Sequence, residues 1–174
     1  SVNIAKSYLL GRSKLFYETA INDHGLPHDP FKSCIVPRPI GWVSTVDRDG
    51  VVNLAPYSFF NGVASEPPMV MFASNGRQPH GVKDTVTNCE STGEFVCNLA
   101  TWNLRGEMNQ TSAPFSPEID EIKAAGLGIG KSTLVKPPRV WDCPIHMECK
   151  HYKTIELPCD RDDHRNAIVI GEVV

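Results

Sequence analysis

Two cations and a hydroxyl flank the expected start of a helix, where they could bind an anion together. Arg77 lies in a loop that contains Gly and Pro, and Lys83 and Thr85 open a helix expected over residues 82–92. The first N–H groups of a helix have no intrahelical partner, so they favour a negatively charged group such as phosphate. Taken alone, Arg77 and Lys83 are more typical of solvated surface charges than of a phosphate site.

A second set of polar groups lies at or just after expected strands, where hydroxyls and amides can meet a polar ligand. These groups are Ser44, Thr45, Ser58 and Asn61. Trp42 and the adjacent Phe59 and Phe60 could stack on a flat ligand or wall it in. The alternative is that the aromatic rings belong to the core and that the serine and threonines are ordinary strand residues.

Two other motifs are weaker. Residues 126–132 end like a phosphate-binding loop, but Ala125 stands where the motif requires glycine, so these glycines are expected to end a helix. Cys143, His146, Cys149 and His151 resemble a metal cluster, but strand alternation places His146 on the opposite face from the others. The chain has no GxSxG or HExxH motif, which favours chemistry carried by a cofactor.

Short β-branched runs must position these residues. Residues 40–46 and 51–55 are expected to form a hairpin around the turn 47–50, and Pro56 is expected to stop the second strand. We predict a polar loop over 57–62 and a buried strand over 69–73. Further strands are predicted over 95–99, 133–136, 145–153 and 167–174, with short helices over 82–92, over 102–110 and from Ser116. Many strands and few helices indicate a barrel or a sandwich.

The ordered motifs resemble a known family. They include RPIGWVST at 38–45, the DG turn at 49–50 and NLAPYSFFNGVASEPPMVMF at 53–72. They continue through KDT at 83–85, GEFVCN at 93–98, KPPR at 136–139 and IGEVV at 170–174. In this order they resemble the flavin reductase-like family of FMN-binding split barrels.

The resemblance implies a mainly β fold, a split β-barrel with a few short helices, that binds FMN or FAD. It implies an NAD(P)H:flavin reductase that passes hydride to flavin N5 for a partner oxygenase or another electron acceptor. It also implies a homodimer. The implied flavin residues are Trp42, Ser44, Thr45, Ser58, Phe60, Asn61, Arg77, Lys83 and Thr85. The alternatives are an FMN-binding electron carrier without nicotinamide activity and a non-catalytic split-barrel binding protein.

Bulk properties are those of a globular protein. With 174 residues, 21% of them charged and 41% apolar, we expect an N-terminal arm over 1–30 and a single domain over 31–174. The apolar run at 167–174 has no turn after it, so we expect the native chain to continue. The net charge of −3 gives no reason to expect nucleic acid or a membrane as partner. Six scattered cysteines are typical of reduced thiols and favour a cytoplasmic protein.

Overall fold

The computed structural model describes residues 16–76, 84–113 and 121–174, and the chain divides into two units, Ser1–Pro37 and Arg38–Val174. In the first unit the helix α2 (Pro30–Cys34) begins after Asp29, whose carboxylate accepts a hydrogen bond from Phe31 N at 2.9 Å. Pro30 suits the first helical position because its missing N–H would have no intrahelical partner there. None of the five described residues of α2 is buried.

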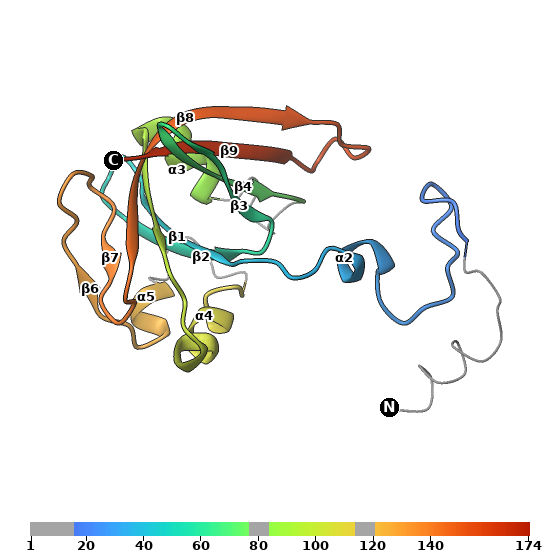
Figure 1. The fold of residues 1–174 in the computed structure, drawn as a ribbon, viewed down its shortest axis with the longest axis horizontal. Helices are drawn as coiled ribbons and strands as arrows, with labels where there is room; N and C mark the ends of the chain where they lie inside the picture. The colour runs from blue at the N-terminus through green and yellow to red at the C-terminus, as the bar shows by residue number, and fades with distance from the viewer. Residues whose placement is uncertain (1–15, 77–83, 114–120) are drawn as a thin grey trace. The chain divides into compact units, whose positions relative to one another are not determined.

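The second unit is built on one antiparallel sheet of seven strands in the order β2-β1-β5-β8-β9-β4-β3. Its strands are β1 (Gly41–Val46), β2 (Val52–Tyr57), β3 (Phe60–Ser65), β4 (Pro68–Ser74), β5 (Glu94–Asn98), β8 (His146–Leu157) and β9 (Asn166–Val173). A separate pair is formed by β6 (Ile129–Gly130) and β7 (Arg139–Val140). In Figure 1 the long β8–β9 pair lies at the top and the β1–β2 pair below it.

The hairpin predicted at the start of the sheet is confirmed, with one correction at its end. Gly50 has φ +87°, and Asp47 Oδ1 accepts hydrogen bonds from Asp49 N and Val51 N, which together form the turn. The prediction that Pro56 ends the strand is wrong, because Pro56 pairs with Trp42 inside β2. Since β2 is an edge strand, a residue without an N–H is tolerated there.

The prediction of a polar loop over residues 57–62 is also wrong in part. The turn between strands is confined to Ser58 and Phe59, and β3 begins at Phe60, which pairs with Phe72 of β4. The aromatic cross-strand pair stabilises the ladder although the residues that follow Phe60 in β3 are all exposed. Because β2 and β3 are consecutive in the chain yet form the two edges of the sheet, the sheet must curl back on itself.

The curled sheet encloses the main core. Its buried members come from six of the seven sheet strands and from the helix α3 (Asp84–Thr92), as expected for the interior of a barrel. They are Val43, Tyr57, Val70, Phe72, Val86, Cys89, Phe95, Cys97, Cys149 and Val169. The predicted end of α3 at Gly93 is confirmed, because Gly93 has φ +75° and donates its N–H to Cys89 O.

A second core lies on the other face of β1 and β2. Trp42, Leu54, Ile122, Val140 and Cys143 are buried there. The elements around it include η1 (Trp102–Leu104), α4 (Arg105–Gln110) and α5 (Glu121–Ala124). The helical prediction over 102–110 is confirmed, whereas the predicted cap at Ser116 lies outside the described residues. Within the described part of the chain, no helix has the length and apolar character needed to cross a membrane.

The strand predicted over 133–136 is wrong, because the backbone there binds carboxylates instead of a neighbouring strand. Thr133 N and Leu134 N donate to the Glu148 carboxylate at 2.8 and 2.6 Å, and Lys136 N donates to Glu94 at 2.8 Å. Glu148 is buried on β8, so its charge has to be balanced by such donors. The segment therefore forms a loop wrapped around two acidic side chains.

Candidate functional site

Three of the predicted ligand residues lie together at the turn between β2 and β3. Ser58 and Phe60 are half-buried, and Asn61 is exposed, with its Oδ1 accepting a hydrogen bond from Gly62 N at 3.0 Å. The Phe60 ring packs directly on Gly41, where a Cβ atom would come within 2.5 Å of the ring. The Phe60 ring also packs against the main core, whereas the exposed Asn61 is the next residue of β3 and faces the other way.

A buried polar layer links β1 and β2 to α3. Thr85 Oγ1 donates to Asn53 Oδ1 at 2.7 Å, and Asn88 Nδ2 donates to Thr45 Oγ1 at 3.1 Å. Thr45 and Asn53 are direct cross-strand partners, and Thr85 and Asn88 are three residues apart on one face of the helix. The layer links Thr45 and Thr85 through Asn53 and Asn88, and both hydroxyls bond to protein groups inside the barrel.

Trp42 and Ser44 point to the opposite face of β1. The Trp42 indole Nε1 donates to Thr111 Oγ1 at 2.9 Å, and the Ser44 hydroxyl donates to Pro138 O at 2.6 Å. Asn98 Nδ2 donates to Ser44 Oγ at 3.2 Å. Because neighbouring residues of a strand face opposite ways, the structure does not bring Ser44 next to Thr85.

The two predicted cations, Arg77 and Lys83, lie outside the described residues. Their described neighbours are Gly76, at the end of the turn after β4, and Asp84, the first residue of α3. Gly76 N donates to Asn166 Oδ1 at 3.2 Å, and Arg165 N donates to Gly76 O at 3.3 Å. The point at which this segment leaves the sheet is thus held by the loop between β8 and β9.

Two residues of this region were missed in the sequence analysis. Asn88 belongs to the buried polar layer, and its position three residues after Thr85 on the expected helix was a usable signal. Arg38 places its guanidinium 5.7 Å from the centre of the Phe59 ring, a cation–π contact. No local sequence pattern predicts this contact between Arg38 and Phe59. The loop that carries Phe59 was predicted to extend over 57–62, which left the position of its ring undefined.

The residues of the two weaker motifs have structural partners. Gly126 has φ +70° and donates its N–H to Lys123 O, so it ends α5 as predicted. His146 Nε2 lies 2.8 Å from Val140 O, and His151 Nε2 lies 2.9 Å from Thr154 Oγ1. Among the described residues, no group of three or more His, Cys, Asp or Glu side chains could hold a metal ion.

A cavity of about 680 Å³ lies at the other end of the β1–β2 hairpin. It is lined by the hairpin turn, the C-terminal end of α3 and the segment 136–138, with Arg48 and Lys136 as its cations. None of the predicted flavin residues that the structure describes lines this cavity. A six-residue strand spans about 20 Å, so the cavity is remote from the β2–β3 turn.

Comparison with known proteins shows to which family this chain belongs. Residues 33–174 match the family described as flavin reductase like domain. This chain belongs to the flavin reductase-like family. Its antiparallel sheet with few short helices is the split-barrel fold of flavin reductases, as the sequence analysis predicted.

Individual relatives extend this similarity over most of the flavin reductase-like chain. An uncharacterised protein of Aquifex aeolicus is 45% identical over 123 residues, 71% of this chain and 63% of its own length. The structure of nitrilotriacetate monooxygenase component B from Bacillus cereus is 32% identical, with a TM-score of 0.82, and the match covers 94% of this chain and 81% of that one. The structure of 2-nitrobenzoate 2-nitroreductase from Pseudomonas fluorescens is 30% identical, with a TM-score of 0.73, and the match covers 91% of this chain and 74% of that one. The chain spans less than two thirds of the length of the first curated relatives that it matches.

The β2–β3 turn of this flavin reductase-like domain carries three residues of the predicted site, two of them polar and one aromatic. Ser58 and Asn61 place a hydroxyl and an amide near this turn, while the half-buried Phe60 ring faces the core. The Thr85 hydroxyl at the start of α3 is already bonded to Asn53.

Proposed function

We propose that this domain binds FMN, with FAD as the alternative flavin, and acts as an NAD(P)H-dependent flavin reductase. The observation that carries the proposal is the family match over residues 33–174. The gathering of Ser58, Phe60 and Asn61 at one turn supports it, because these residues come from the motif that carries the resemblance. The 32% identity to a monooxygenase component B supports a role beside a partner oxygenase or another electron acceptor.

In this proposal each group of residues has a separate task. Ser58 and Asn61 meet the polar edge of the ring, and Phe60 walls one side of it. The phosphate lies near Arg77 and Lys83, next to the start of α3. Thr45 and Thr85 act indirectly, because their buried hydrogen bonds hold α3 against the sheet.

A bound flavin would supply the two-electron chemistry, taking a hydride equivalent from reduced nicotinamide and giving the two electrons and the proton to an acceptor. The protein then has to orient the two rings and exclude water. No side chain has to act as a general acid or base in that hydride step.

The burial of Cys89 raises the pKa of its thiol, and a hydrogen bond with Cys149, together with burial, raises the pKa of the Cys97 thiol. Neither thiol is therefore suited to act as a nucleophile.

We also propose that the protein is a homodimer. Residues 61–65 of the edge strand β3 are all exposed, and Val63 keeps 52% of its surface accessible. On β8, Tyr152, Ile155 and Leu157 are exposed as well. An open strand edge and exposed apolar side chains are the kinds of surface that an isologous contact covers.

The test is the absorbance spectrum of the purified protein, with and without added FMN, followed by anaerobic addition of NADH or NADPH. We expect a flavin spectrum that bleaches when the nicotinamide is added. Bound flavin that does not bleach with either donor would favour the electron carrier. A colourless protein that does not quench flavin fluorescence would favour the non-catalytic binding protein.

A further inference from the structure

The cavity of about 680 Å³ at the tip of the β1–β2 hairpin, which we call the hairpin cavity, lies one strand length, about 20 Å, from the β2–β3 turn. Its walls are the turn over 47–50, the C-terminal end of α3 and the loop over 136–138. All three walls belong to the second unit and to the described part of the chain. Sites for small molecules typically have volumes of this size, about 300–1,000 Å³.

Two cations from separate walls line the hairpin cavity, Arg48 from the turn and Lys136 from the loop. Lys136 donates its backbone N–H to the Glu94 carboxylate at 2.8 Å, but that carboxylate forms its ion pair with Lys150. Among the described residues, neither the Arg48 guanidinium nor the Lys136 ammonium has a partner for a hydrogen bond or an ion pair. Two positive charges are therefore available to a ligand that enters the cavity.

Apolar side chains line the same cavity. Val46 and Val52 are cross-strand partners at the end of the hairpin, and Pro138 is buried in the loop. Ile129 on β6 also lines the cavity and keeps 52% of its surface accessible. An apolar surface next to positive charges favours a ligand with a hydrocarbon body and a negative group, because the body leaves water while the charge keeps a partner.

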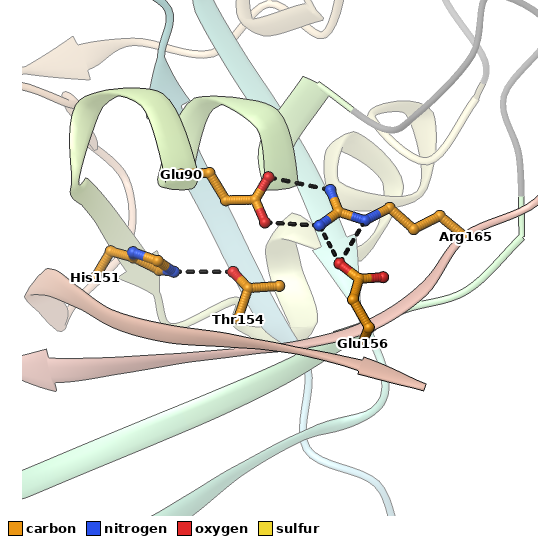
Figure 2. A network of polar contacts seen from close by, with 5 residues as sticks. All are labelled: Glu90, His151, Thr154, Glu156 and Arg165. Atoms are coloured by element: carbon orange, nitrogen blue, oxygen red, sulfur yellow. Dashed lines mark hydrogen bonds and ion pairs between the residues drawn. The ribbon is translucent and has the colours of Figure 1, made fainter. Parts of the chain in front are cut away.

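The α3 wall is held in place without a ligand. Ser91 and Thr92 line the cavity from this helix. The residue before them, Glu90, accepts hydrogen bonds from Arg165 Nη1 and Nη2 at 3.1 and 2.7 Å (Figure 2). The same guanidinium donates its Nε to Glu156 Oε1 on β8 at 2.9 Å, so the end of α3 is tied to the sheet. A wall that is fixed beforehand lowers the entropy lost when a ligand binds.

Two carboxylates also belong to the lining, those of Asp47 and Asp49. Asp47 Oδ1 accepts hydrogen bonds from Asp49 N and Val51 N at 2.9 and 2.8 Å, so the Asp47 charge is partly balanced by the turn. Asp49 is exposed. Its carboxylate repels an anion in the cavity, so removing that charge should strengthen the binding of an anion.

We propose that the hairpin cavity is a second ligand site, which binds a small organic anion with an apolar body and a single carboxylate or sulfonate group. The negative group lies between Arg48 and Lys136, and the body lies against Ile129 and Pro138. The inference stands apart from the proposed function, since none of the described flavin residues lines this cavity.

The test is isothermal titration of naphthalenesulfonate into the protein, with the neutral naphthalenesulfonamide as the comparison ligand. We expect the sulfonate to bind at one site and the sulfonamide to bind about 10-fold more weakly or less, since it lacks the charge. Arg48→Gln and Lys136→Gln should each weaken sulfonate binding about 5-fold, and Asp49→Asn should strengthen it about 2-fold. The affinity for the sulfonamide should be the same in the parent and in all three variants.

Arg161→Gln and Lys153→Gln are the matched controls. Arg161 is 67% accessible, Lys153 is exposed on β8, and neither residue lines the cavity. Sulfonate affinity should be unchanged in both variants. Thermal unfolding reports whether each variant folds. Because Arg48 and Lys136 lie in different segments, either variant carries the comparison if the other does not fold.

The outcomes separate this inference from the proposed function. No binding of the sulfonate, or equal affinity in the parent, Arg48→Gln and Lys136→Gln, overturns the second site. Competition between the sulfonate and FMN also overturns it, because the sulfonate would then occupy the flavin site. Each of these results leaves the proposed function standing. A parent protein that binds the sulfonate but no flavin contradicts only the proposed function.

Discussion

Asn88 of α3 donates its side-chain amide to the Thr45 hydroxyl of β1, at 3.1 Å, inside the barrel. Both side chains are buried, and Thr45 faces Asn53, which accepts a hydrogen bond from Thr85 one turn earlier on the helix. The helix is thus held by two polar contacts to one cross-strand pair. Polar contacts of this kind define one position of α3, which apolar packing alone defines less strictly.

Removing this contact should destabilise the fold. Asn88→Ala leaves the buried Thr45 hydroxyl without its donor, which should lower the free energy of unfolding by about 1–3 kcal/mol. Urea denaturation measures the change. Thr87→Ala is the control, because Thr87 is exposed on the same helix and its loss should cost less than about 0.5 kcal/mol. Equal losses in the two variants would contradict the role assigned to Asn88.

The Glu148 carboxylate should stabilise the protein only above acidic pH. Burial raises its pKa, but hydrogen bonds from the backbone of residues 133–135 and the nearby Arg139 outweigh burial, so the pKa lies below its usual range. A lowered pKa in the folded state means that the contribution is present above the unfolded pKa and is lost as the pH falls through the folded one. Glu148→Gln should therefore cost about 1–3 kcal/mol at pH 7.

That cost should shrink steadily as the pH falls below about 4. Urea unfolding of the parent and of Glu148→Gln at a series of pH values gives the difference directly. A difference that is constant down to pH 3 would mean that the carboxylate charge does not hold the 133–136 loop.

Two glycines should respond in opposite ways to replacement by alanine. At Gly171 a Cβ atom would lie 2.3 Å from the Phe95 ring and 3.2 Å from Lys150 O, so Gly171→Ala should destabilise the barrel by about 1–3 kcal/mol through overpacking. At Gly106, in α4, no atom lies within 4 Å of the added Cβ. Gly106→Ala should stabilise the protein by up to about 1 kcal/mol, because alanine favours the helix. Thermal unfolding of both variants tests the pair, and a tolerated Gly171→Ala would refute the packing argument.

Lys83→Ala should separate FMN from riboflavin. A charged hydrogen bond contributes about 1.5–3 kcal/mol, so FMN binding should weaken by roughly 10- to 150-fold. Riboflavin lacks the phosphate and should bind almost unchanged. Titration of both ligands into parent and variant decides the matter, with the exposed Lys131→Ala as the control. Equal losses for both ligands would assign Lys83 to the fold or to the ring.

The exposed edge strand should carry the dimer contact. Analytical ultracentrifugation of the parent should show a dimer, and Val63→Glu should shift it towards the monomer because it places a charge in an apolar contact. Ile129→Glu is the matched control, since Ile129 on β6 is equally exposed, at 52%. A stable monomeric parent that binds FMN tightly would rule out the proposed dimer.

The sequence predicted the elements whose signals are local. The turn around Gly50 and the end of α3 at Gly93 each rest on a glycine with positive φ, and both are observed. The end of β8 was predicted four residues early, because the register shift between His151 and Lys153 breaks the alternation. The loop around Glu148 could not be predicted, since its hydrogen bonds join positions about fifteen residues apart.

The candidate site was harder to predict than the fold. Alternation along β1 separates Ser44 from Thr45, but it does not say which face is covered by α3 and which by the segment near Pro138. From the sequence, the hydroxyls of Thr45 and Thr85 therefore cannot be distinguished from hydroxyls that bind a ligand. Only the tertiary contact of α3 with β1 and β2 shows that they bond to the protein.

The position of β9 between β4 and β8 has a consequence for how this chain folds. During synthesis β4 emerges far ahead of β9, so its inner edge has no partner while β1 and β2 can already form their local hairpin. The entropy of closing so long a loop has to be overcome before the β4–β9 ladder forms, which favours slow folding. Until then β4 lacks its β9 partner, so its apolar residues, including Phe72, form an unpaired edge that favours contact with other chains.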